Sequence, residues 1–121
     1  MQLKSYKELI VWQKSIELVI EVYNLTEKLP KEETYGLISQ MRRAAISIPV
    51  NIAEGRRRGS RKDFRHFFLI SFGSGAELET HIEIVKKLKF GSNLNYSRLE
   101  SMLDEIMRML NKMTSNLQAT S

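Results

Sequence analysis

Hydrophobic residues recur every three or four positions through most of the chain, which is the spacing of one face of an α-helix. Short segments that contain proline, glycine or several polar residues interrupt this pattern. The interruptions predict four helices, over residues 6–29, 32–57, 60–90 and 96–117. Because no segment has the alternating pattern of a β-strand, the sequence predicts an all-α protein.

The first predicted helix has recognisable signals at both ends. Ser5 and Glu8 have the spacing of a capping box, in which two side chains satisfy the first free N–H groups of a helix. The apolar residues that follow, including Trp12 and Ile16, form one broad face suited to a core. Pro30 ends the helix because proline cannot continue the backbone hydrogen-bond pattern.

Pro49 interrupts the second predicted helix, since a proline inside a helix removes one backbone hydrogen bond and crowds the preceding turn. The apolar period nevertheless continues across it. We therefore expect a kink near Ala45 to Pro49 rather than two separate helices. Gly55 and Gly59 flank Arg56 to Arg58, which predicts a helix end followed by a tight connection.

The third predicted helix opens at Ser60, a residue suited to cap it, and its first half is apolar on nearly all sides. That half has more apolar surface than one bundle core can cover, which favours contact between subunits. The small residues from Gly73 to Ala76 would let another helix approach closely. Asn95 or Ser97 is the expected cap of the fourth helix.

Short connections between consecutive helices favour antiparallel neighbours, so the expected fold is an up-down-up-down four-helix bundle with a kinked second helix. We expect one domain over residues 1–121, with a frayed tail from Thr114 to Ser121. The first residues do not resemble a signal peptide, and the longest apolar run is far shorter than a membrane helix. The sequence therefore predicts a soluble, cytoplasmic protein without a membrane partner.

Positive charge is concentrated in one part of the chain. Between Arg42 and Arg65 there are eight Lys or Arg and two Asp or Glu, a local charge of +6, whereas the whole chain carries +5. Arginine predominates here, and its guanidinium group can bind two phosphate oxygens at once. The candidate nucleic-acid-binding residues are Arg42, Arg43, Arg56, Arg57, Arg58, Arg61, Lys62 and Arg65.

Two other interpretations of this charge remain open. One is a solvated face with local ion pairs, such as Glu54 with Arg58, and the other is ion pairing between subunits. Aromatic residues such as Trp12 and Phe67 could stack on bases, but their helical spacing favours packing. The position of the charge is therefore the main argument for a phosphate-bearing partner.

Catalytic and metal-binding patterns are scarce. The chain has no cysteine, and neither His66 nor His81 belongs to a Glu-x-x-His pair of the kind that di-iron bundles use. Glu77 and His81 could share a metal, but two ligands without a second pair make a poor site. The serines and glycines match neither a nucleophile elbow nor a phosphate loop. We expect no catalytic residue, no metal and no cofactor, and hence no enzyme.

Several segments carry a family resemblance: Leu9 to Lys14, Tyr35 to Ala45, Ser47 to Gly55 within the motif I-S-I-P-V-N-I-A-E-G, and Gly73 to Thr80. From about Tyr6 to Leu110 the chain resembles the bacterial 23S rRNA intervening sequence proteins. The resemblance implies an antiparallel four-helix bundle that assembles as a ring-like homopentamer. A more distant similarity, to the accessory variability protein of diversity-generating retroelements, implies a basic surface that engages nucleic acid and a reverse transcriptase.

The sequence thus predicts a non-enzymatic, homo-oligomeric helical bundle that binds structured RNA or DNA through a basic surface, mainly by phosphate contacts. The alternative is an interaction scaffold or accessory subunit whose basic patch binds an acidic protein. The two hypotheses differ in whether bare nucleic acid is sufficient for binding.

Overall fold

The computed structural model describes residues 5–119 of the chain. Four long helices make up most of this part: α1 (Ile10–Thr26), α2 (Ser39–Arg58), α3 (Arg61–Lys87) and α4 (Ser97–Ala119). The connections contain the 3-10 turns Tyr6–Glu8, Lys31–Glu33 and Lys89–Gly91 and the π-helical turn Thr34–Ile38. Because the described residues include no β-strand, the predicted all-α class is confirmed.

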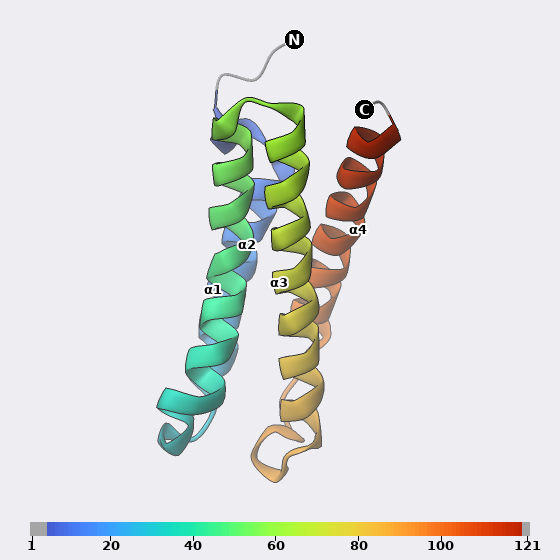
Figure 1. Cartoon of the computed structure of the whole chain (residues 1–121). Coiled ribbons are helices and arrows are strands. Elements are labelled where there is room, and N and C mark those ends of the chain that lie inside the picture. The colour runs from blue at the N-terminus through green and yellow to red at the C-terminus, as the bar shows by residue number, and fades with distance from the viewer. Residues whose placement is uncertain (1–4, 120–121) are drawn as a thin grey trace.

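Consecutive helices run in opposite directions (Figure 1). α2 contacts α1 and α3, and α4 contacts α3 and α1, so the contacts are those of an up-down bundle. Leu18, Met41, Phe68 and Leu110 contribute one fully buried side chain from each helix to the core. Among residues 5–119, no helix is both long enough and apolar enough to span a bilayer.

The first helix is shorter than predicted at both ends. The Ser5 side chain accepts a hydrogen bond from the N–H of Lys7 at 3.1 Å, but this cap opens the 3-10 turn Tyr6–Glu8. Leu9 is extended, with φ −72° and ψ 126°, and α1 begins only after it. The helix ends at Thr26, before Pro30 is reached. The predicted span 6–29 is therefore corrected to Ile10–Thr26.

The second helix continues through Pro49 as one helix rather than two, as predicted, and the kink expected near Ala45 to Pro49 stays a prediction. The backbone departs from helical angles earlier, at Gly36, which has φ −109° and ψ −112°. Glu33 stabilises this turn, since its Oε1 accepts a hydrogen bond from the N–H of Leu37 at 3.2 Å. The predicted start at residue 32 is therefore too early, because two short turns precede α2.

The motif I-S-I-P-V-N-I-A-E-G, which ends at Gly55, contacts α3. Gly55 allows the helices to lie close together, since a Cβ at this position would be 2.9 Å from the Cβ of Phe67. The Ser71 hydroxyl donates to the carbonyl of Ile48 at 2.9 Å, which adds a buried polar link between the helices. These contacts fix the end of α2 relative to the beginning of α3, where the basic residues lie.

The caps of the last two helices agree with the sequence prediction. The Ser60 hydroxyl accepts a hydrogen bond from the N–H of Asp63 at 3.1 Å and caps α3. At the start of α4, Asn95 Oδ1 accepts a hydrogen bond from the N–H of Ser97 at 3.0 Å. Of the two predicted caps of α4, Asn95 therefore supplies the acceptor.

The predicted frayed tail is wrong as far as Ala119, because α4 remains helical to this residue. Thr114 is buried, and its hydroxyl donates to the carbonyl of Leu110 at 3.0 Å. Thr120 and Ser121, which belong to the same prediction, lie outside the described residues. This last part of α4 forms one side of a groove, and the first turns of α3 form the other.

Candidate nucleic-acid interface

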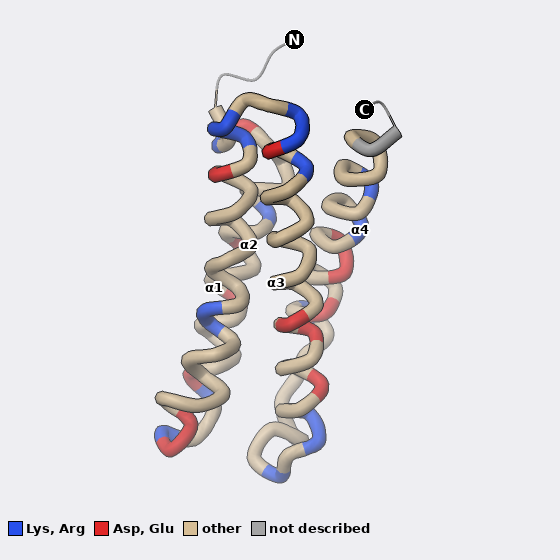
Figure 2. The backbone as a smooth tube through the Cα atoms, in the orientation of Figure 1, with Lys and Arg blue, Asp and Glu red and all other residues tan. Residues whose placement is uncertain are grey.

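The basic residues between α2 and α3 lie at one end of the bundle (Figure 2). Arg56 to Arg58 form the last turn of α2, where the partial negative charge of a helix C-terminus favours cations. Gly59 follows with φ +83°, a left-handed conformation that glycine adopts at little cost. The chain then reverses direction into α3, which places Arg61 and Lys62 at the same end of the bundle.

Neighbouring side chains hold two arginines of this turn in place. The guanidinium of Arg57 lies 5.6 Å from the centre of the Tyr6 ring, and that of Arg58 lies 5.1 Å from the Phe67 ring. Arg58 Nε also donates to Glu54 Oε2 at 2.8 Å, which is the ion pair that the sequence predicted. Because 52% of the Arg58 side chain remains exposed, the pair leaves it accessible to a ligand.

A groove lies between the first turns of α3 and the end of α4. It has a volume of about 540 Å³, and its lining residues are Arg61, Lys62, Arg65, His66, Leu69 and Leu117. Arg65 Nε donates to the carbonyl of Thr114 at 3.3 Å, which links the two helices there. Three of the predicted binding residues thus line one cavity near the N-terminus of α3, a position that favours anions.

Arg42 and Arg43 lie apart from this cluster. Arg57 follows Arg43 by fourteen positions of continuous helix, a distance of about 21 Å along the axis. Arg42 instead links α1 to α2, because its Nε donates to Thr26 Oγ1 at 2.9 Å and its guanidinium lies 4.1 Å from the centre of the Tyr23 ring. Arg42 and Arg43 therefore lie outside the cluster that the other six candidate residues form at the basic end.

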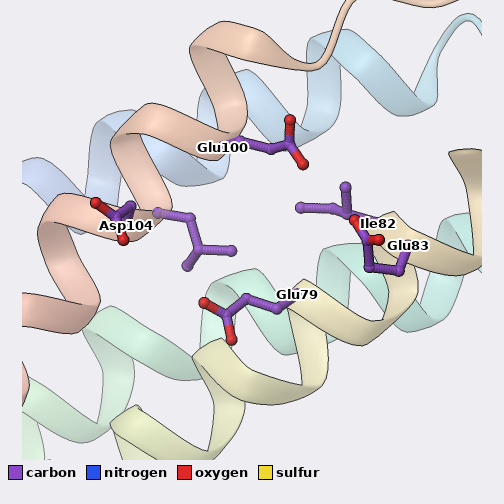
Figure 3. A pocket seen from close by; sticks show the side chains of 6 residues that line it. Glu79, Ile82, Glu83, Glu100 and Asp104 are labelled. Carbon is purple, nitrogen blue, oxygen red and sulfur yellow. The ribbon is translucent and has the colours of Figure 1, made fainter.

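Acidic residues gather in a different cleft, between α3 and α4 (Figure 3). The cleft has a volume of about 370 Å³ and is lined by Glu79, Ile82, Glu83, Glu100, Leu103 and Asp104. Lys86 Nζ lies 2.9 Å from Glu100 and 3.4 Å from Glu83, and the hydrogen bond to Glu100 is the main cause that raises the pKa of Lys86. This cleft was not predicted from the sequence, although each of the two helices carries two acidic residues spaced by four.

The histidines lie at different places along α3. His81 Nε2 lies 3.8 Å from Glu77 Oε2, and His81 Nδ1 is buried without a hydrogen bond. His66 lines the basic groove, about 22 Å away along the helix. Within the described part of the chain, no three histidine or acidic side chains are grouped so that they could hold a metal ion.

Two apolar surfaces are exposed on the outside of the bundle. A shallow groove of about 290 Å³ lies between α1 and α2, and its lining includes Trp12, Ile16 and Val50. Leu69 and Ile70 are exposed on α3. The second surface belongs to the half of α3 for which the sequence predicted an excess of apolar residues. Exposed apolar surfaces of this kind are often places where another molecule binds.

The fold and the charged end define a four-helix bundle with a basic terminal surface. Residues 7–112 match the family described as 23S rRNA-intervening sequence protein, so the chain belongs to this family and the resemblance is confirmed. The structure is similar to the crystal structure of a protein with unknown function from the S23 ribosomal protein family of Bacteroides thetaiotaomicron. The TM-score is 0.74 and the sequence identity 26%, over 87% of this chain and 98% of that chain. No curated protein matches the sequence.

Proposed function

We propose that the basic end of the bundle binds structured RNA or DNA, mainly through phosphate groups, and that the protein does not catalyse a reaction. The observation that supports this proposal is the gathering of six cations at one end: Arg56, Arg57, Arg58, Arg61, Lys62 and Arg65. Two acidic residues offset two of them: Glu54, through its ion pair with Arg58, and Asp63 in the first turn of α3. A strong positive field remains, which attracts a polyanion.

The chemistry of this surface favours phosphate over a single carboxylate. Guanidinium groups bind phosphate oxygens in pairs, and the N-terminus of α3 adds a partial positive charge. The acidic cleft between α3 and α4 repels a polyanion, so it confines binding to the basic end. Phosphate contacts carry no base information, and we therefore expect weak sequence discrimination. The family name refers to 23S rRNA, which makes RNA the first ligand to test.

We also propose that the protein is a homo-oligomer, with the ring-like pentamer as the expected state. The exposed apolar groove between α1 and α2 and the exposed Ile70 of α3 support an association through apolar surfaces. A ring would repeat the basic end several times on one particle. Several weak phosphate contacts would then act together and raise the overall affinity.

The test is a titration of labelled RNA and DNA hairpins of unrelated sequence, followed by fluorescence anisotropy at several salt concentrations. The proposal predicts similar affinities for the different sequences and a steep loss of affinity as salt increases. Absence of binding at low salt, with the oligomer intact, would contradict it. That result would turn attention to an acidic protein as the partner of the basic end.

A further inference from the structure

The groove between α3 and α4 has two chemically different walls. Arg61, Lys62 and Arg65 supply positive charge, whereas Leu69 and Leu117 supply an apolar surface. Leu69 is 41% exposed, so much of its side chain is in contact with solvent. A ligand that fills this groove must therefore combine negative charge with an apolar body.

If a ligand contacts this groove only through phosphates, the apolar side chains of Leu69 and Leu117 remain exposed to water. A paired helix presents its charged backbone to a protein, while its bases remain stacked and paired inside. An unpaired nucleotide in a loop or bulge instead exposes a flat base beside its phosphates, and such bases are the usual targets of selective RNA recognition. The two parts of an unpaired nucleotide thus match the two walls of the groove.

We propose that this groove receives one unpaired nucleotide of the bound nucleic acid, with its base against Leu69 and Leu117 and its flanking phosphates near Arg61, Lys62 and Arg65. The inference rests on the proposed function, because nucleic acid must first reach the basic end. The volume of about 540 Å³ falls within the range of small-ligand pockets, roughly 300–1,000 Å³.

The side chains around the groove support this arrangement. The hydrogen bond from Arg65 to the carbonyl of Thr114, at 3.3 Å, holds part of the cationic wall in position before a ligand arrives. His66 adds an aromatic ring to the lining, with its ring centre 5.0 Å from that of Phe67 in an edge-on arrangement. A preformed wall lowers the entropy that a ligand must offset on binding.

The first test compares two RNA duplexes with equal numbers of phosphates, one blunt and fully paired and the other with a single bulged nucleotide. The wild-type protein is expected to bind the bulged duplex roughly fivefold more tightly, the gain expected when about 40 Å² of apolar surface is removed from water. Leu69→Gln should remove this preference, so that the variant binds the blunt and the bulged duplex equally. Ile84→Gln is the matched control, because Ile84 is similarly exposed on α3 (44%) and does not line the groove.

A second readout follows the base itself. With 2-aminopurine at the bulge, the wild-type complex should show a change in base fluorescence, and the Leu69→Gln complex should not, although anisotropy shows that it has formed. Light scattering checks that each variant keeps its oligomeric state. If Leu69→Gln alters that state, Leu117→Gln tests the other apolar side chain of the groove.

The possible outcomes separate this inference from the proposed function. Equal affinity of the wild-type protein for the blunt and bulged duplexes would overturn the nucleotide site and leave phosphate binding intact. A preference that survives in both leucine variants would also overturn it. Failure to bind either duplex would overturn the inference and the proposed function together.

Discussion

The guanidinium of Arg57 lies over the ring of Tyr6, 5.6 Å from its centre. Tyr6 belongs to the 3-10 turn that precedes α1, whereas Arg57 belongs to the last turn of α2. The Tyr6 ring also contacts Trp12 edge-on, with ring centres 5.4 Å apart. The turn before α1 therefore supports an arginine that we propose to bind phosphate.

Tyr6→Ala is expected to weaken nucleic-acid binding roughly two- to fivefold, because an exposed cation–π contact is worth about 0.5–1 kcal/mol. Tyr6→Phe keeps the ring and should bind as the wild-type protein does. Anisotropy titrations of one RNA hairpin at fixed salt measure both variants. Equal losses in the two variants would show that the ring does not position Arg57.

Gly55→Ala is expected to destabilise the fold by about 1–3 kcal/mol, because the added methyl group would press on Phe67 across the contact between α2 and α3. Gly73→Ala is the matched control. Its Cβ would meet no atom within 4 Å, so it should stabilise helix α3 by roughly 0.5–1 kcal/mol. Urea unfolding followed by circular dichroism measures both, and a stable Gly55→Ala protein would contradict the close approach of these helices.

Arg42→Ala is expected to lower the free energy of unfolding by about 1 kcal/mol, through the loss of its hydrogen bond to Thr26 and its contact with Tyr23. Its affinity for nucleic acid should remain close to that of the wild-type protein, because Arg42 lies far from the basic end. A clear loss of affinity without a loss of stability would show that Arg42 belongs to the binding surface.

The helical periods in the sequence predicted the four helices because each helix buries one face in the core. The basic turn could be predicted as well, since Gly55 and Gly59 mark the end of α2 on either side of its arginines. Arg42 and Arg43 were grouped wrongly with this turn. A helix rises about 1.5 Å per residue, so Arg42 and Arg43 lie too far from the turn to share a site with its arginines.

The acidic cleft and the groove at the basic end depend on how α3 and α4 face each other. The sequence shows that Glu79 and Glu83 share a side of one helix, and Glu100 and Asp104 a side of another. It does not show that these sides meet. The non-helical backbone at Gly36 depends in the same way on the contacts of the folded chain, and so it could not be predicted from local spacing.

The fold is expected to lose stability in alkaline solution. Burial raises the pKa of Tyr96 above its ordinary value of 10.0, and the hydrogen bond to Glu100 raises that of Lys86 above 10.5. A group whose pKa is higher in the folded chain stabilises the fold fully below its unfolded pKa, and this contribution is lost as pH rises through the folded pKa. Unfolding midpoints in urea should therefore decrease above about pH 10.

Tyr96→Phe tests how much of this pH dependence comes from the Tyr96 hydroxyl. It removes the hydrogen bond from the Tyr96 hydroxyl to the carbonyl of Gly91, 2.7 Å long, and should cost roughly 0.5–1.5 kcal/mol at neutral pH. The decrease of its urea midpoint in alkaline solution should be smaller than that of the wild-type protein. If the urea midpoint of Tyr96→Phe decreases with pH as much as that of the wild-type protein, this hydroxyl does not contribute to the pH dependence.

Val50→Lys is expected to dissociate the proposed oligomer without unfolding the bundle, because Val50 is 56% exposed and lines the apolar groove between α1 and α2. Sedimentation velocity reports the oligomeric state, and circular dichroism reports the helical content. The dissociated protein should bind hairpins more weakly despite its added positive charge, since it loses the repeated contacts. An unchanged sedimentation coefficient would exclude this groove as the subunit contact.

The most direct test of phosphate binding at the basic end compares two variants that each lose three positive charges. One replaces Arg56, Arg57 and Arg58 by alanine, and the other replaces Lys31, Lys87 and Lys89, exposed residues at the opposite end of the bundle. The slope of log affinity against log salt for a hairpin should become shallower by about 2 to 3 in the arginine variant and stay unchanged in the lysine variant. Equal changes in both slopes would contradict a localised phosphate site.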